Sequence, residues 1–218
     1  DGAGMRSRLI PGGDRPLAGI EPVLIGGELH LIGFFGEPRF IALRGTYYGR
    51  WNITTMEVIS ETYEPFEKSL IMRSVSKGQR VRFEQRFAKG KTKEFRYYKL
   101  REPIQNSTGG MVLLAEQYYV SSTASRDANG AEKATYYYHY EDLLIHNFDR
   151  EGQLVWSAKV PKHQISKNDN GNHSSYAATW VDERLVLMYY DHPINLYYKG
   201  GEPAVLRNMR NEPLLLMV

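Results

Sequence analysis

The sequence predicts an all-β protein built from repeated four-stranded antiparallel meanders. Tyr is the commonest aromatic residue, with 16 copies against 8 Phe and 3 Trp, and Tyr favours strands and half-buried surfaces. Apolar and aromatic runs of strand length alternate with short turns rich in Gly, Asn and Asp, which is typical of antiparallel sheets. Helical spacing of apolar residues occurs only after Pro65.

The first meander is expected to begin with a hairpin. Residues 20–25 and 28–35 are two β-rich runs joined by Gly26-Gly27, and a two-residue Gly-Gly connection is a strong hairpin signal. Residues 45–48 and 53–59 are the next expected strands. Together these four strands form the first meander.

Residues 65–102 are expected to form a basic, partly helical insertion. Phe66, Leu70, Ile71 and Val75 recur near helical spacing,. Residues 68–101 contain twelve Lys or Arg against two acidic residues, a local balance of +10 in a chain whose formal total is +3, so the remainder carries −7. We expect this segment to interrupt the sheet pattern as a helical or partly disordered excursion.

The second meander contains the most apolar strand of the chain, at residues 111–120. A nearly continuous apolar run is typical of a strand that is covered on both faces. Residues 121–135 are too polar for a core and are expected to form a long projecting hairpin loop,. Residues 136–148 and 153–160 are expected to complete the meander.

A third meander is expected over residues 176–181, 184–191, 204–209 and 214–218. Three such units resemble propeller blades, but propellers close with four to eight blades. We therefore expect an incomplete β-propeller-like architecture, in which residues 1–218 are a single all-β domain or a fragment of a larger propeller whose missing edge a partner supplies. A twisted sandwich or an irregular barrel is the alternative. A start at Asp1 rather than Met fits processing or a missing segment.

Several classes of site are excluded by composition. The chain has no Cys, which excludes disulfides, thiolate zinc sites and cysteine nucleophiles. No apolar run approaches the roughly 18–20 residues of a membrane-spanning helix, so no transmembrane segment is expected. No phosphate-binding or dinucleotide-binding glycine motif occurs, and we expect no cofactor.

A resemblance to a known group of proteins rests on four stretches of sequence. These are Gly109-Gly110 with the apolar strand after it, the Tyr-rich residues 136–145, the pattern Asp-x-x-Gly-x-x-x-Trp at residues 149–156, and Asn168-Asp169-Asn170-Gly171. In these stretches the chain resembles uncharacterised propeller-like envelope proteins of Bacteroidota-type bacteria, over roughly residues 20–195. The resemblance implies a propeller-like fold and a location in the cell envelope, the periplasm or outside the cell, as a soluble or peripheral protein. It implies no activity and no catalytic residue.

The basic insertion supplies the expected partner-binding residues, which we call the basic surface. They are Lys68, Arg73, Arg80, Arg82, Arg86, Lys89, Lys91, Lys93 and Arg96. Such a charge asymmetry attracts acidic protein subunits, anionic lipids or acidic glycans. Nucleic acid is disfavoured because the interleaved aromatic residues match no RNA-binding or DNA-binding motif. These aromatics favour a segment that docks onto a surface, and a solvated insertion that keeps the protein soluble is the alternative.

Candidate catalytic residues are few. Glu116 lies in the most apolar strand, where an ionised carboxylate is costly unless it is paired. It is the best single candidate for a functional carboxylate, with Asp142 or Asp191 as partners for glycosidase-type acid and base chemistry. The alternative is a structural Glu that backbone amides or a Tyr hydroxyl satisfy. Ser174 and Ser175 follow His173, but no nucleophile motif surrounds them.

No metal site is expected. His163, Asp169, His173, Asp191 and His192 offer suitable ligand atoms,. Their spacing matches no metal-binding signature, and Asp169-Asn170-Gly171 lacks the alternating acidic residues of a calcium loop. We expect polar loops at one rim of a β structure, with residues 169–171 forming a turn.

The leading functional hypothesis is a non-enzymatic interaction or scaffold subunit of a larger envelope-associated complex. One alternative is a carbohydrate-active hydrolase that uses carboxylates such as Asp142, Asp169 or Asp191. Another is a glycan-binding module that uses surface Tyr residues and Trp51.

Overall fold

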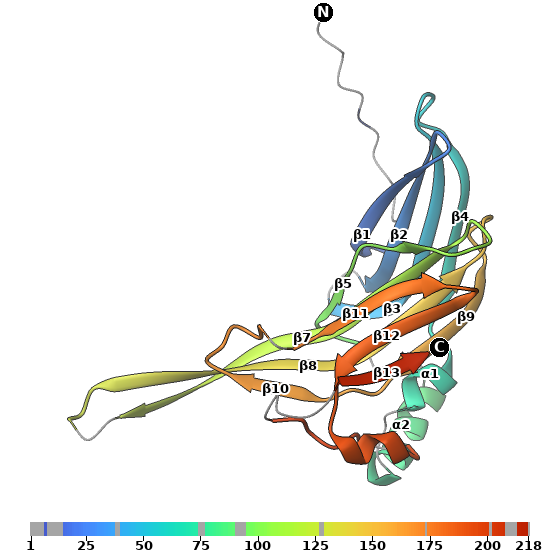
Figure 1. Cartoon of the computed structure of the whole chain (residues 1–218). Coiled ribbons are helices and arrows are strands. Elements are labelled where there is room, and N and C mark those ends of the chain that lie inside the picture. The colour runs from blue at the N-terminus through green and yellow to red at the C-terminus, as the bar shows by residue number, and fades with distance from the viewer. Residues whose placement is uncertain are drawn as a thin grey trace, which may run out of the picture.

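The computed structural model describes residue 7 and residues 15–37, 40–73, 77–89, 95–126, 129–172, 174–200, 202–207 and 213–217. The described strands form three antiparallel sheets of four, six and three strands (Figure 1). The predicted mostly-β, antiparallel class is therefore confirmed. The sheets are open, and none closes into a barrel or a propeller.

The first sheet is the expected four-stranded meander, in the order β1-β2-β3-β4. Its strands are β1 (Leu17–Ile25), β2 (Glu28–Glu37), β3 (Phe40–Asn52) and β4 (Val58–Pro65). Gly26 and Gly27 both have positive φ angles, of 57° and 85°, as a type I′ hairpin turn requires. The predicted hairpin is confirmed, since Ile25 pairs with Glu28.

The fourth strand begins later than the expected start at residue 53. Asn52 Oδ1 accepts hydrogen bonds from the amides of Thr54 and Thr55, and Met56 has a φ of 61°. An Asn side chain that caps its own turn in this way competes with strand pairing. Strand β4 therefore starts at Val58.

The basic insertion is helical, as expected, in α1 (Lys68–Met72) and α2 (Lys77–Ala88). Its end returns to a sheet, because β5 (Tyr98–Leu100) pairs with a strand of the second sheet. Phe83 and Phe95 are buried in the main core, and the Phe95 ring packs edge-on against Phe66 at 4.9 Å. These aromatics therefore anchor the insertion to the protein's own core.

The second sheet lies between the other two layers. Its order is β10-β8-β7-β5, with β6 paired to β7 and β9 paired to β8. The bounds are β6 (Ile104–Gln105), β7 (Met111–Arg126), β8 (Glu132–Phe148), β9 (Leu154–Val160) and β10 (Gln164–Lys167). Met111 and Leu113 enter the core shared with the first sheet and the helices, whereas Val112 and Leu114 pack with the third sheet. The predicted coverage of both faces is confirmed for Met111 to Glu116, whereas residues 117–120 are only partly covered.

Strands β7 and β8 continue far beyond the body of the sheet. Residues 121–135 were expected to be a loop, but pairing runs out to Arg126 and Glu132. This segment is rich in Ser, Thr and Ala, and residues 121–126 pair one to one with residues 132–137, which suits a two-stranded ribbon. The expected projection from the body is plain in Figure 1, where the ribbon reaches away from the three sheets.

The third sheet has three strands rather than four. Its order is β11-β12-β13, with bounds β11 (Tyr176–Val181), β12 (Arg184–Tyr190) and β13 (Pro213–Met217). The expected strand at residues 204–209 is absent from its described part. Instead, the Leu206 amide donates a hydrogen bond to His163 O, and the Leu206 carbonyl accepts one from Ile165 N. Both backbone groups of Leu206 therefore bond to the start of β10. The sheets are thus unequal, and the prediction of three four-stranded meanders was wrong.

No helix in the described part of the chain is long and apolar enough to cross a membrane. A short 3-10 helix, η1 (Pro193–Tyr197), follows β12.

His146 is a buried polar residue in the core between the first two sheets. Its ring stacks on Phe66 at 5.6 Å, and Nδ1 lies 2.7 Å from Ser157 Oγ. Complete burial lowers the pKa of His146 from 6.5 to about 3. Its imidazole is therefore neutral in the folded protein at all but strongly acidic pH.

We expect His146→Phe to change how stability depends on pH. Between pH 6.5 and about 3 the unfolded chain binds a proton at His146 that the folded chain does not bind. The free energy of unfolding of the wild type therefore falls by up to ~1.4 kcal/mol per pH unit as pH decreases through this window. The variant lacks this loss, so its stability relative to wild type should rise from pH 7 to pH 4 in urea titrations. A constant difference would contradict the assignment.

Candidate functional site

Glu116, the leading candidate from the sequence, lies on β7 at the seam between the second and third sheets. Its side chain is 2% exposed, and its partner is the fully buried Lys162 of the β9–β10 connection. Lys162 Nζ lies 2.7 Å from Glu116 Oε1. The structural alternative is therefore the better description of Glu116, but the partner is a lysine rather than an amide or a Tyr hydroxyl.

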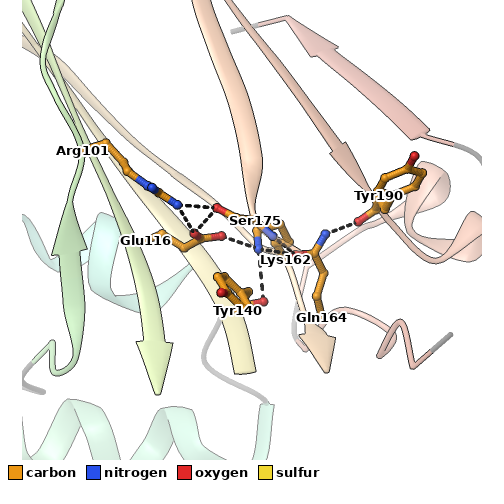
Figure 2. Close-up of polar contacts among 7 residues, drawn as sticks. All are labelled: Arg101, Glu116, Tyr140, Lys162, Gln164, Ser175 and Tyr190. Atoms are coloured by element: carbon orange, nitrogen blue, oxygen red, sulfur yellow. Dashed lines mark hydrogen bonds and ion pairs between the residues drawn. The ribbon is translucent and has the colours of Figure 1, made fainter. Parts of the chain in front are cut away.

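A network of hydrogen bonds surrounds this ion pair (Figure 2). Lys162 Nζ also donates to Tyr140 O at 3.2 Å and to Gln164 Oε1 at 3.0 Å. Gln164 Nε2 donates to Tyr190 O at 2.6 Å, and Gln164 Oε1 accepts from Ser175 N at 2.8 Å. The network therefore joins β8 and β10 of the second sheet to the start of β11 and the end of β12, at the open end of this hairpin.

Burial and pairing act in opposite directions on Lys162. Desolvation lowers the pKa of its ammonium group, and the neighbouring Glu116 carboxylate opposes that shift. The ammonium group donates two hydrogen bonds within the network and forms the ion pair with Glu116. A buried pair of this kind stabilises little over an apolar pair, but removing one partner leaves an uncompensated charge.

The outer end of the network is formed by Arg101 and Ser175. Arg101 Nη2 donates to Ser175 Oγ at 2.9 Å, and Ser175 Oγ donates to Glu116 Oε2 at 2.5 Å. Arg101 Nη2 is also 3.8 Å from Glu116 Oε2. The Ser175 oxygen accepts a hydrogen bond from a cation, which makes it a poor nucleophile. Both Glu116 oxygens have partners, so the cluster is suited to holding groups in place rather than to proton transfer.

Asp142 and Asp191 do not join Glu116 in an acid and base pair. Asp142 Oδ2 lies 2.6 Å from the ammonium of buried Lys159. Asp191 Oδ1 accepts from His192 N and from Asn195 Nδ2, each at 2.7 Å, beside η1. Burial raises the pKa of Asp191. Neither residue lines the pocket beside α1 and β9 or the pocket beside β11.

A second polar cluster, centred on Glu141, was not found from the sequence. Glu141 Oε1 lies 3.2 Å from His163 Nε2 and 3.8 Å from His139 Nδ1, and it accepts from Tyr119 OH at 3.3 Å. Burial, and secondarily the charge of Asp142, raises the pKa of Glu141 to about 7. The only feature of the sequence that could have indicated this cluster is the two-residue spacing of His139 and Glu141, because its other members lie elsewhere in the chain.

A β-bulge explains why two consecutive carboxylates lie here. Glu116 pairs with Leu143 and Tyr118 pairs with Tyr140. Between these two pairs β7 has one residue and β8 has two. The extra residue falls at Glu141 and Asp142. Bulges re-aim side chains, and this one lies at the junction between the sheet body and the projecting ribbon.

The sequence pattern of possible metal ligands has no counterpart in the described structure. Where the chain is described, no group of three His, Asp or Glu residues is arranged to hold a metal ion. His163 contacts Glu141 instead, and His173 lies outside the described residues. Asp169 accepts from Ser166 Oγ and Gly171 N, which confirms the predicted turn.

The basic surface lies along α1, α2 and the segment before β5. Its members Lys68, Arg73, Arg80, Arg82, Lys89 and Arg96 are exposed. Lys68 Nζ lies 3.5 Å from Glu84 Oε1. The side chain of Arg86, and all of Lys91 and Lys93, fall outside the described part.

Trp51 does not form the surface platform expected of a glycan-binding module. It is 4% exposed and packs in a cluster with Leu31 and Tyr47. Its position on a strand of the first sheet turns the ring inward.

Compared with known proteins, the chain matches no protein-family model, no curated protein and no solved structure. Function is therefore inferred from the geometry of the molecule itself.

Lys162→Met should destabilise the protein by about 3–5 kcal/mol, because it leaves the Glu116 carboxylate buried without a counter-ion. Adding Glu116→Gln to Lys162→Met should restore most of this loss, since the buried charge is then removed. Lys167→Met, at an exposed position of β10, is the matched control and should change stability by less than about 0.5 kcal/mol. Urea unfolding at pH 7 measures all three. Equal effects of Lys162→Met and Lys167→Met would show that the pair is not a structural constraint.

Proposed function

We propose that this protein is a non-enzymatic interaction subunit of a larger assembly. Its main contact is the projecting ribbon of residues 118–126 and 132–140, which we call the arm (Figure 1). The observation that carries this proposal is that the arm has one apolar face that the rest of the described molecule leaves largely uncovered.

The strand register defines the two faces of the arm. The cross-strand pairs of one face are Tyr118 with Tyr140, Val120 with Tyr138, Ser122 with Tyr136, and Ala124 with Ala134. Paired residues share a face and alternate along each strand. Beyond Ala124 and Ala134 this face ends in the charged pair Arg126 and Glu132. The other face pairs Tyr119 with His139, Ser121 with Tyr137, Thr123 with Thr135, and Ser125 with Lys133, and is the more polar of the two. The arm is therefore an amphipathic ribbon.

Only the base of the apolar face is covered. Tyr138 OH donates to Asn170 Oδ1 at 2.8 Å, and Gly171 lies against the Tyr140 ring. Farther out, Val120 and Tyr136 remain 45% and 48% exposed. Full burial of such a side chain contributes about 1.5–3 kcal/mol, and a two-stranded ribbon is marginally stable alone. A partner with an apolar surface would stabilise both.

The apolar face is continuous with the side of the second sheet that packs on the third sheet. Leu114, Glu116, Tyr118 and Val120 lie on the same face of β7, and the first two face the third sheet. A partner on the arm would thus extend an interface that the protein already uses internally. We also propose that the sheets belong to an incomplete propeller. The outer edges of β4 and β9, which no described strand pairs, support this. The proposed location in the cell envelope is supported by the family resemblance.

The basic surface is the second proposed contact, with acidic protein, anionic lipid or acidic glycan as its partner. Its exposure on α1 and α2 supports this role. An enzymatic role is not favoured, since Glu116, Asp142 and Asp191 are each occupied by their own partners.

Tyr136→Ser should abolish most partner binding, whereas Tyr137→Ser should not. The two residues are adjacent but lie on opposite faces of the arm, so they form a matched pair. The measurement is native mass spectrometry of the tagged chain purified from its native cells. We expect at least a tenfold loss of the co-purifying subunit for Tyr136→Ser, at low and high salt alike, because apolar contacts resist screening. Equal retention by both variants, or a lone wild-type monomer, would overturn the proposal.

Arg82→Glu combined with Lys89→Glu should remove the salt-sensitive part of the binding. Screening weakens exposed charge contacts, so the wild type should lose several-fold of its partner between about 50 and 500 mM salt. The double variant should bind weakly at both concentrations. Arg184→Glu, at the exposed first residue of β12, controls for net charge. If the salt dependence of binding is unchanged in the double variant, the basic surface does not contact the partner and only keeps the protein soluble.

A further inference from the structure

A pocket of about 630 Å³ opens beside the outer end of the ion-pair network. It lies between β11 of the third sheet and the segment that joins β5 to β6. Its lining residues are Arg101, Glu102, Pro103, Ile104, Leu114, Ser174, Ser175, Tyr176 and Ala178. Arg101, Glu102, Ser174 and Ser175 supply polar lining, which we call the polar wall, and Ile104, Leu114 and Ala178 supply apolar lining, which we call the apolar wall.

Arg101 is held in place in the polar wall. Its guanidinium donates to Ser175 Oγ and lies 6.0 Å from the centre of the Tyr176 ring. The side chain is nevertheless 54% exposed, and a guanidinium has five donors. A fixed Arg with donors remaining loses little side-chain entropy on binding and matches the two oxygens of a carboxylate.

Ser174 adds a donor that lacks a partner within the protein. Its Oγ is buried in the described structure and makes no hydrogen bond there. A buried polar atom of this kind costs about 1–3 kcal/mol. The adjacent Ser175 has a φ of 81°, a conformation that non-glycine residues rarely adopt and that tends to mark ligand sites. If the Ser174 side chain turns toward the pocket, a bound acceptor would satisfy its hydroxyl.

The charges around the pocket select a ligand with a single negative charge. Glu116 is compensated by Lys162, but Glu102 also lines the pocket. A phosphate group carries close to two negative charges at neutral pH and would be repelled more strongly than a carboxylate. The apolar wall adds affinity for a ligand with a short hydrocarbon body.

We propose that this pocket binds a carboxylate carried on a short apolar body. The Arg101 guanidinium receives the carboxylate, the Ser174 hydroxyl donates to it, and the wall of Ile104, Leu114 and Ala178 holds the apolar part. Such a ligand is a short acyl chain or the C-terminal residue of a peptide. This site is independent of the arm and of the partner that the arm binds.

The test is titration of the full chain with sodium hexanoate and with N-acetylleucine, followed by amide NMR shifts of Ser174, Ser175 and Tyr176. We expect at least one probe to saturate below about 50 mM, a weak affinity typical of so small a ligand. Preference for hexanoate identifies an acyl ligand, and preference for N-acetylleucine identifies a peptide terminus. The proposal is overturned if neither saturates, or if hexanol, hexylamine or inorganic phosphate binds as tightly.

Variants separate the pocket from its supporting network. Arg101→Gln should weaken binding of the probe at least tenfold, and Ser174→Ala should weaken it about threefold. Arg184→Gln lies outside the pocket and should bind as wild type. Ser174→Ala leaves every hydrogen bond of the network intact, so it tests the site even if Arg101→Gln unfolds. Wild-type affinity in both Arg101→Gln and Ser174→Ala would refute the proposal.

Discussion

The ion pair between Lys162 and Glu116 is the constraint on which the arrangement of the second and third sheets depends. Both charges are buried, so the carboxylate and the ammonium must meet in one geometry or the desolvation cost is not offset. Gln164 and Ser175 complete the hydrogen bonding and tie the β11–β12 hairpin to β8 and β10. Apolar packing holds these layers together. The polar network fixes their register.

Strands β7 and β8 serve first as the centre of the protein and then as its most exposed part. In the body, alternate residues of β7 enter two different cores. Beyond the bulge at Glu141 and Asp142 the same alternation continues, but Val120 and Tyr136 in the outer part of the arm are exposed. The apolar face that is core in one half is therefore exposed in the other. The bulge also gathers His139, His163 and Tyr119 around Glu141.

The pocket and the arm thus both border the ion-pair network. Toward the solvent side of the network, Arg101 and Ser175 border a pocket whose polar wall the ion pair organises. Toward the arm, the network ends at Tyr140, whose ring pairs with Tyr118 at the base of the apolar face. The proposed contact through the arm and the proposed ligand site in the pocket therefore share structural support without sharing residues. Rigid support of this kind favours binding, because little conformational entropy is lost when a partner binds.

Local patterns determined much of the fold from the sequence alone. The Gly26-Gly27 hairpin, the helical start of the basic insertion and the two-sided burial of Met111 to Ala115 all follow from turn chemistry and periodicity, which act over a few residues. The sequence also singled out Glu116, because a lone acid in an apolar strand needs a partner. Only the tertiary structure decided that the partner is Lys162, that residues 121–135 pair as an arm, and that Leu206 serves β10 rather than a fourth strand. Strand register and buried charge pairing join residues far apart in the chain, so no local pattern encodes them.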